Sequence, residues 1–583
     1  MNRKNLTAAV LAGLAGAAGI AGTAQAVNLN PDGLGQVLIY PYYTSNDGNE
    51  TLLSVVNTTD SAKAVKVRFK EGYNSRDVLD FNMYMSAWDV WVAAVADNQG
   101  TPTLYIPDTT CTVPYLYEQD SDGDGVGEQE FLNYDYTGDR SDNGPTGIDR
   151  ASEGHFEIIE MGTLTNDSET KDRLGSADAA THEIDDDGNQ LPADCQQLVD
   201  NWTENPDGMW LDNNGSPGDE GYIARPQDID ISRNSGGLFG GAAIINGARG
   251  TMYAYNARAV QGFDKRPNGN HFVPANEFPS LTSGSENDAT VFFGVPQNKA
   301  VTLYGYPRGV DAISAVFMHE YTMNEYAIEA AIGGASEWVI TFPTKNFYVD
   351  SDLTDLFVEK WVPDSENDEV GCLGWDEGED FPARSGPNFS DQFDQSDTDW
   401  EQCTYIDIGE DIGSEPFTSV FNDDGEACEE FKIEIWDREE NSGEGANNPR
   451  PPIVSPPPPG GSSESDENVL CYEVNVMRFG NDGVFGSVFG TTSDLLKTVD
   501  TGSVPYDNGT KFKPKTSGWA RINWFFDDEH VDYHGLVGLP VTGFWAEQFA
   551  NAFLGNGADV LANYGGLFDH KGNVRRISPR YSD

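Results

Sequence analysis

The stretch WVITFPTKNFYVD, residues 338–350, decides the fold class of this chain. Its apolar side chains recur at every second position on both sides of a Pro-Thr-Lys break, as Trp338, Ile340, Phe342, Phe347 and Val349. Aromatic and β-branched residues at a period of two are typical of a half-buried β-strand rather than a helix. Pro343 restricts such a strand to a sheet edge or a bend. We therefore predict a strand at a junction within a β-rich core, and we expect acidic loops to extend from that core.

The same alternation occurs on both sides of this stretch. Apolar and polar residues alternate at 65–70, 79–86, 431–436 and 471–476, whereas 311–333 has helical or mixed character. Clusters of turn-forming residues separate the N-terminal segments, and short strands with such punctuation are typical of antiparallel sandwiches. The predicted fold class is all-β, an antiparallel β-sandwich of immunoglobulin-like type. We expect one or two sandwiches with long acidic loop insertions.

Changes in composition predict the organisation of the chain. The segments are a signal peptide at 1–26, an N-terminal β region at 27–117, an acidic and possible calcium-binding insertion at 118–235, a core β region at 236–360, an acidic loop insertion at 361–415 and a C-terminal β region at 416–583. Within the first insertion, residues 155–164 are predicted to form a strand. Within the last region, the Pro/Gly/Ser-rich loop at 441–468 is predicted to be an exposed spacer rather than a fold element.

The N-terminus has the features of a secretory signal peptide. Arg3 and Lys4 precede an Ala- and Gly-rich apolar run at 6–22, and the tripeptide AQA at 24–26 matches a cleavage site. The alternative is a single N-terminal membrane anchor. No later run approaches the roughly 20 apolar residues that span a bilayer. We expect no integral membrane span after cleavage, and a location at the cell surface, in the extracellular space or in the periplasm.

The charge of the chain restricts its partners. It carries 96 acidic against 35 basic residues, a formal net charge of −61. Such a field repels nucleic acid phosphates and anionic membrane surfaces, so neither is expected as a partner. It also destabilises the folded state by self-repulsion. Dissolved salt would screen this repulsion, and bound divalent cations would neutralise part of the charge. An acidic surface that only keeps the protein soluble is an equally open interpretation.

Six cysteines in an exported chain favour up to three disulfides. Fifteen complete pairings exist, and pairing of sequence neighbours would join Cys111 with Cys195, Cys372 with Cys403, and Cys428 with Cys471. No C-x-x-C motif occurs, so a structural zinc site is not favoured.

The sharpest binding motif is DSDGDGVGE at 120–128. It places carboxylates at positions 1, 3 and 5 and glycine at position 6 of an EF-hand-like calcium loop, but Phe131 occupies position 12, where a glutamate is expected. The predicted Ca²⁺ ligands, with one of the last two closing the shell, are Asp120, Asp122, Asp124, Glu128 and Glu130. The alternative is a solvated acidic turn. Weaker versions of the motif occur at 185–188 and 422–425.

The sequence contains few other motifs that indicate metal binding or catalysis. His530 and His534 lie four residues apart, a spacing that serves a metal on a helix, but this segment is predicted to be a turn between strands. Neither a G-x-S-x-G elbow nor a glycine-rich phosphate-binding motif occurs. Chance carboxylate pairs are unavoidable among so many acids, and only their separation in space would identify a glycosidase. We therefore name no catalytic and no cofactor-binding residue.

Several segments together resemble a known group of proteins. They are VLIYPYYT at 37–44, NEYAIEA at 324–330, WVITFPTKNFYV at 338–349, IWDREE at 435–440, LPVTGFWAEQF at 539–549 and NYGGLFDHK at 563–571. The combination is similar to an uncharacterised family of exported, secreted or cell-surface proteobacterial β-rich proteins. The resemblance covers most of the chain apart from the acidic inserts. It implies an exported location and supplies no catalytic residues.

These features predict a non-catalytic secreted or cell-surface structural or interaction protein, with acidic loops stabilised by calcium. One alternative is a secreted carbohydrate-binding or carbohydrate-active protein, for which the aromatic content of 11% could furnish sugar-stacking surfaces. A second alternative is a subunit of a surface filament that assembles through an exposed strand edge. The corresponding partners would be a surface polysaccharide or further copies of the chain.

Overall fold

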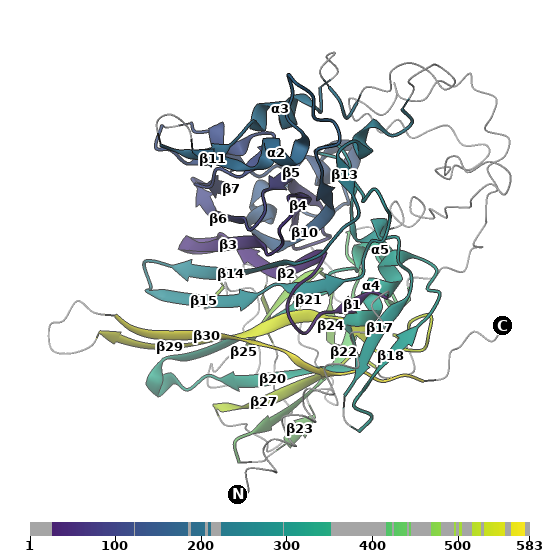
Figure 1. Cartoon of the computed structure of the whole chain (residues 1–583). Coiled ribbons are helices and arrows are strands. Elements are labelled where there is room, and N and C mark those ends of the chain that lie inside the picture. Colours follow the sequence, from purple (N-terminus) through teal and green to yellow (C-terminus); the bar gives the residue numbers. More distant parts are fainter. Residues whose placement is uncertain are drawn as a thin grey trace, which may run out of the picture.

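The computed structural model (Figure 1) describes residues 26–350, apart from 122, 185–187, 204–207, 212–222 and 295. It also describes residues 415–577, apart from 423–424, 440–441, 445–467, 480–494, 497–500, 504–515, 526–529 and 554–560. Several sequence predictions therefore lie outside the described residues: the signal peptide before residue 26, the acidic loop at 361–414, Cys372 and Cys403, Asp122, the acidic triplet at 185–187 and most of the Pro/Gly/Ser-rich loop.

Two large sheets form the N-terminal sandwich. Sheet I has the order β1 (Asn28–Leu29), β16 (Arg258–Gln261), β2 (Val37–Thr44), β10 (Glu153–Leu164), β4 (Lys63–Glu71), β5 (Asp77–Met85), β8 (Cys111–Val113), with β13 (Ile231–Ser232) beside β10. Sheet II has the order β15 (Thr251–Asn256), β14 (Leu238–Asn246), β3 (Asn49–Asn57), β6 (Val90–Asn98), β7 (Thr101–Ile106), β9 (Gly127–Glu130). The predicted strand at 155–164 is thus β10, in the interior of sheet I.

Two further sheets follow in the C-terminal half. Sheet III has the order β26 (Thr501–Ser503), β25 (Val474–Phe479), β21 (Gly334–Thr341), β29 (Thr542–Phe553), β30 (Leu561–Asp569). Sheet IV has the order β23 (Ser442–Glu444), β22 (Glu429–Asp437), β27 (Ser517–Asn523), β20 (Tyr321–Ala327), β31 (Lys571–Asn573), with β24 (Asn468–Leu470) beside β22.

Short elements connect and cover these sheets. The small strand pairs are β11 (His182–Ile184) with β12 (Gln190–Pro192), β17 (Ala289–Phe293) with β18 (Lys299–Leu303), and β19 (Met318–His319) with β28 (Leu539–Pro540). The described α-helices are α2 (Ser176–Ala180), α3 (Cys195–Asp200), α4 (Gly309–Phe317) and α5 (Asn346–Val349). The pairing of the named strands is antiparallel except between β25 and β26. The predicted all-β antiparallel sandwich is confirmed, and the mixed segment at 311–333 contains most of α4 followed by β20.

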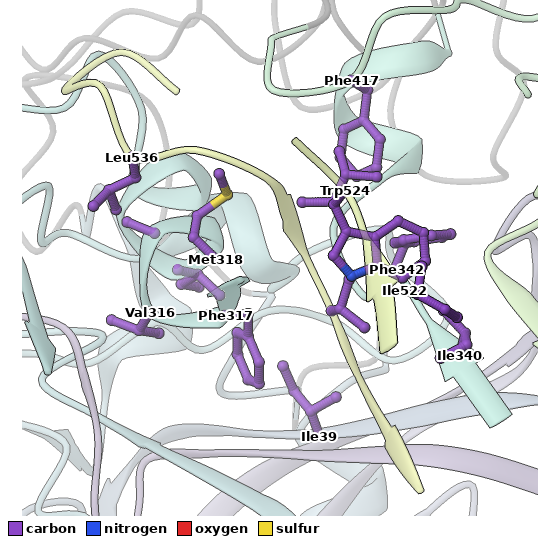
Figure 2. Packing of buried hydrophobic residues seen from close by; sticks show 14 of the residues in the cluster. Ile39, Val316, Phe317, Met318, Ile340, Phe342, Phe417, Ile522, Trp524 and Leu536 are labelled. Atoms are coloured by element: carbon purple, nitrogen blue, oxygen red, sulfur yellow. The ribbon is translucent and has the colours of Figure 1, made fainter. Parts of the chain in front are cut away.

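Strand β21 separates two hydrophobic cores, so it is buried on both faces rather than on one. Val339 joins the core between sheets I and II. Trp338 and Ile340 point the other way, into a core shared with sheet IV and α4. Figure 2 shows part of this second core, where Ile340 lies with Phe342, Ile522 and other apolar side chains. In Figure 1 the strands of sheet III accordingly run between those of sheet II above and those of sheet IV below.

The structure corrects the predicted strand at 338–350 beyond its first half. β21 ends at Thr341, and the residues from Asn346 to Val349 form α5, so the apolar positions after Pro343 belong to a helical turn. Backbone bonds from Lys345 N to Phe342 O and from Phe347 N to Thr344 O make the turn. Pro343 was expected at a sheet edge or at a bend, and the structure places it at a bend. β21 itself lies between β25 and β29 in the interior of sheet III.

Candidate functional site

The predicted calcium loop is an ordered turn organised by one carboxylate. Asp120 accepts hydrogen bonds from the amides of Gly123 (2.6 Å) and Gly125 (2.9 Å), one on each oxygen. Both glycines have positive φ angles, of 82° and 88°, which side chains other than glycine rarely adopt. Asp124 accepts from the amide of Val126 at 2.9 Å. The loop therefore curls around the carboxylate at position 1, as an EF-hand-like loop requires.

Strand β9 brings a glutamate to this loop. Glu128 lies opposite Tyr105 in register, and its carboxylate accepts a hydrogen bond from the hydroxyl of Ser121. Glu130 follows on the same face of β9 and is exposed. Phe131, at position 12, is 1% exposed and belongs to the core between sheets I and II. Glu128 is thus the residue placed to complete a shell with Asp120 and Asp124.

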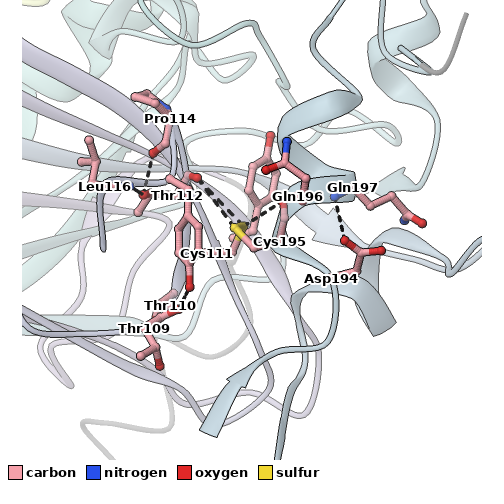
Figure 3. Close-up of a disulfide and its surroundings, with 12 residues drawn as sticks. Thr109, Thr110, Cys111, Thr112, Pro114, Leu116, Asp194, Cys195, Gln196 and Gln197 are labelled. Atoms are coloured by element: carbon pink, nitrogen blue, oxygen red, sulfur yellow. Dashed lines mark hydrogen bonds between the residues drawn. A yellow bond between two sulfur atoms is a disulfide. The ribbon is translucent and has the colours of Figure 1, made fainter. Parts of the chain in front are cut away.

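Two of the predicted disulfides are present. Cys111 of β8 is bonded to Cys195 at the start of α3 (Figure 3), and Cys428 is bonded to Cys471. Their sequence separations of 84 and 43 correspond to about 4–5 kcal/mol of stabilisation each in the chain-entropy model. Disulfides persist in oxidising compartments, so these two indicate a location outside the cytoplasm.

The two histidines of the sequence HVDYH, His530 and His534, contact different residues. His530 is 3% exposed; its Nε2 lies 2.8 Å from Glu429, and its Nδ1 lies 2.7 Å from the carbonyl of Trp524. The ring of His534 instead packs edge-on against Tyr306, with 4.5 Å between ring centroids. The imidazoles are therefore not brought together around a shared metal position.

The basic residues of β4 lie inside the protein, although the alternation of Lys66, Arg68 and Lys70 with Val65, Val67 and Phe69 is typical of a strand with one face in solvent. Each is 4% exposed or less and is paired with a carboxylate: Lys63 with Glu160, Lys66 with Asp80, Arg68 with Asp77, and Lys70 with Glu157. The segment 262–285 covers part of this face, where Arg68 donates to the carbonyls of Glu277 and Pro279. Burial lowers the pKa of Lys66, and the attraction of Asp80 only partly offsets this effect.

Arg150 is the centre of a second buried ion cluster. Its Nε and Nη2 donate to the two oxygens of Glu71 at 2.7 and 2.9 Å, and its Nη1 donates to Asp142 at 2.9 Å. The guanidinium also lies over the ring of Tyr136, 4.4 Å from the centroid. Burial disfavours the charged form of Asp142, but Arg150 and Asn74 outweigh burial and hold the pKa of this carboxyl below its ordinary value.

A buried carboxyl and a buried amine lie where the N-terminal sandwich meets the C-terminal half. Glu473 is 1% exposed, and its backbone bonds to Tyr73 on one side and Phe342 on the other. Burial raises the pKa of its carboxyl to about 8, against the attraction of Lys345 and Lys70. Among the described residues, neither of its carboxylate oxygens accepts a hydrogen bond of regular geometry. Lys345 donates to the carbonyls of Ala427 and Cys471, and burial lowers the pKa of its amine.

An aromatic and basic group lies on the outer face of sheet IV. Trp436 and Trp519 face each other across β22 and β27, with 4.1 Å between ring centroids and 10° between planes. Arg521 lies 5.3 Å from the ring centroid of Trp436 and also 5.3 Å from that of Tyr321, and it is paired with Glu434. Trp519 is 37% exposed, so one aromatic ring of this group is open to solvent.

Comparison of the chain with protein-family models, curated proteins and solved structures found no match. Within the part of the chain that the structure describes, no helix is long and apolar enough to cross a membrane.

Sequence reasoning missed the buried ion clusters and the buried side chains of Glu473 and Lys345, because the residues involved come from strands and loops far apart in the chain. One signal was present: basic residues at every second position of β4 are unusual in so acidic a chain.

Proposed function

We propose that this chain is an exported, non-catalytic structural or interaction protein of the cell surface or extracellular space, whose acidic loops are held in shape by calcium. The observation that carries the proposal is the loop at 120–128, in which Asp120 is fixed by two glycine amides and Glu128 is presented by β9. Calcium takes six to eight oxygen ligands in flexible geometries, which such a loop can supply with backbone oxygens and water.

The placement of the ionisable groups supports a non-catalytic role. A group with a strongly shifted pKa is a catalytic candidate when it lies in a cleft. Here His155, His271, Lys345, Glu473 and Asp532 have shifted pKa values, but each is 7% exposed or less. A substrate would not reach them, and their contacts join strands and loops instead. The net charge of −61 further argues against nucleic acid as a partner.

Calcium should bind the full chain and stabilise it. Extracellular calcium modules bind with a Kd of roughly 0.1–1 mM. At 10 mM calcium, such affinities correspond to about 1.4–2.7 kcal/mol of added stability. Isothermal titration and thermal unfolding in low-salt buffer should show both effects, and replacement of Asp120 and Asp124 by asparagine should abolish them.

The matched control is Asp172→Asn, which removes an exposed carboxylate elsewhere in the same acidic segment and should leave calcium binding intact. A melting temperature that is the same in calcium and in chelator would refute the calcium part of the proposal.

A carbohydrate-binding role is a second candidate, favoured by the aromatic group on sheet IV. The exposed ring of Trp519 next to Arg521 and Glu434 resembles a sugar-binding surface, in which a ring stacks and charged groups accept or donate hydrogen bonds. If this role is correct, Trp519→Ala should reduce retention on insoluble polysaccharides about tenfold. Tyr304→Ala, which removes an aromatic residue that is 70% exposed elsewhere, should not. Equal retention of both variants and the native chain would exclude this surface.

A further inference from the structure

Two buried polar side chains face each other across strands β4 and β5. Lys66 and Asn82 are partners in the register of this antiparallel pair, and both are 0% exposed. Directly opposite residues project from the same face of a sheet, with their Cβ atoms about 4.5–5.5 Å apart. The side chain of lysine is long enough to bridge this distance, so the amine of Lys66 can reach the side-chain amide of Asn82.

The surroundings of Lys66 stabilise an ammonium ion poorly. Its Nζ lies 2.6 Å from Oδ1 of Asp80, but it makes no hydrogen bond of regular geometry with the described residues. Lys63, which is equally buried, instead donates hydrogen bonds to Glu160 and Ser235. Burial lowers the pKa of Lys66, and the attraction of Asp80 opposes this effect only in part. The neutral amine, which is the nucleophilic form of lysine, is therefore easier to reach here than at an exposed lysine.

The amide of Asn82 is held by the segment 262–285, which covers this face. Its Nδ2 donates to the carbonyl of Phe272 at 2.8 Å, and its buried Oδ1 accepts no hydrogen bond from the described residues. A buried carbonyl oxygen without a donor is rare in folded proteins and calls for an explanation. A proton donor beside this oxygen would supply one.

Asp80 is placed to be that donor. It lies two residues before Asn82 and hence on the same face of β5, and its carboxylate contacts the amine of Lys66. A carboxylate in this position can take a proton from the ammonium and pass it to the amide, as a general base and then a general acid. Two adjacent strands thus bring a nucleophile, an amide carbon and a proton carrier together inside the protein.

We propose that Lys66 and Asn82 become joined by an intramolecular amide bond in the folded chain, with Asp80 as the proton carrier. The bond fastens β4 to β5 in the interior of sheet I. Every reacting group belongs to the chain itself, so the reaction needs neither an enzyme nor a cofactor. The inference does not depend on calcium binding or on the location of the protein.

The reaction exchanges one amide for another. A proton moves from the ammonium of Lys66 to Asp80, and the neutral Nζ then attacks Cγ of Asn82. The bond between Cγ and Nδ2 breaks, and Nδ2 leaves as ammonium after it takes up the two protons that Nζ has lost. Asp80 carries these protons and ends in its ionised form. One ammonium group and one amide are thus converted into a new amide and a free ammonium ion.

Confinement accelerates this otherwise slow reaction. Groups held in a productive geometry react as if they were present at effective concentrations of up to about 10⁵–10⁸ M. A positioned acid or base contributes a further factor of about 10²–10⁴. Burial also excludes water, which would otherwise compete with the amine for the amide carbon.

Mass spectrometry of the native chain tests the proposal. After denaturation, reduction and digestion with trypsin and chymotrypsin, most molecules should yield a single cross-linked peptide that contains both Lys66 and Asn82. Its mass should be about 17 Da below the sum of the two separate peptides, because one ammonia is lost. Trypsin should fail to cut after Lys66 but should cut after Lys63, which is equally buried in the folded chain.

Two substitutions on β5 test the role of Asp80. Asp80→Asn removes the proton carrier and should leave Lys66 and Asn82 unlinked. Asp77→Asn is the matched control, because it removes another carboxylate of β5, which is paired with Arg68, and it should preserve the bond. A bond that still forms in Asp80→Asn overturns the role of Asp80.

The native chain decides whether the bond exists, even if a variant does not fold. Separate peptides that carry an unmodified Lys66 and an unmodified Asn82 overturn the proposal. A peptide that is lighter by about 18 Da and fragments as an amide between Lys66 and Asp80 also overturns it, since loss of water places the bond on the carboxylate.

Discussion

Replacement of Arg150 by methionine should lower the free energy of unfolding by about 3–5 kcal/mol, because it leaves the buried carboxylate of Glu71 without its paired cation and Asp142 with only Arg76, 3.7 Å away. Arg150 is 6% exposed, and Glu71 and Asp142 accept its hydrogen bonds where η5 (Ile148–Ser152) meets the end of β4. Methionine keeps most of the side-chain volume, so the lost free energy of unfolding reports the removal of the charge rather than the creation of a cavity. Urea unfolding monitored by tryptophan fluorescence would show the effect as a lower midpoint.

Two further variants test whether the unpaired buried charge causes this loss of stability. Arg140→Met removes a partly exposed pair with Asp135 and should cost at most about 1 kcal/mol. Addition of Glu71→Gln and Asp142→Asn to Arg150→Met should restore part of the lost stability, because the triple variant buries no unpaired carboxylate, although glutamine lacks the second oxygen that accepts from the amide of Tyr73. If the triple variant is less stable than Arg150→Met alone, the carboxylates act through other contacts and this explanation is wrong.

The burial of these ions shows what the periodicity of a sequence can and cannot predict. The alternation in β4 correctly predicts a strand and correctly assigns Val65, Val67 and Phe69 to one core. It cannot predict whether the other face meets water, because the segment 262–285, which covers part of that face, lies far away in the chain. Lys66 and Arg68 therefore look like solvent-facing residues in the sequence and are inside in the structure.

The stretch at 338–350 shows a second limit. A period of two and the first turn of a helix both accommodate Phe347 and Val349, and only the local hydrogen bonds after Pro343 decide between them. The cysteine pairing is predicted better: joining each cysteine to its neighbour among the cysteines of the sequence gives Cys111–Cys195 and Cys428–Cys471, and both pairs are bonded. The exposed apolar side chains of Val90, Val92 and Phe239 on the outer face of sheet II lie in unbroken apolar runs of β6 and β14, which are typical of strands covered on both sides.

The contribution of Glu473 to stability should fall as pH rises from about 5 to about 9, and Glu473→Gln should remove that fall. Burial raises the pKa of Glu473 to about 8, from 4.5 for an ordinary glutamate. The folded state therefore keeps its proton in a range where the unfolded chain has lost it, so ionisation in this range favours unfolding. The contribution of this group is fully present below about pH 4.5 and lost by about pH 8. It amounts to about 2–5 kcal/mol.

Glutamine has nearly the shape of protonated glutamic acid and does not ionise, so Glu473→Gln should match the native chain at pH 5 and exceed it in stability at pH 9. The comparison needs the native chain at each pH, because other buried groups also titrate. Asp532, whose pKa burial raises to about 7, contributes a fall of the same sign, whereas His155 and His271, whose pKa burial lowers to about 3, contribute a rise up to about pH 6.5. The exposed Glu183 provides the control, since Glu183→Gln should leave the pH profile unchanged. A Glu473→Gln profile parallel to the native one would mean that the carboxyl is ionised at neutral pH, with Lys345 and Lys70 as its counter-charges.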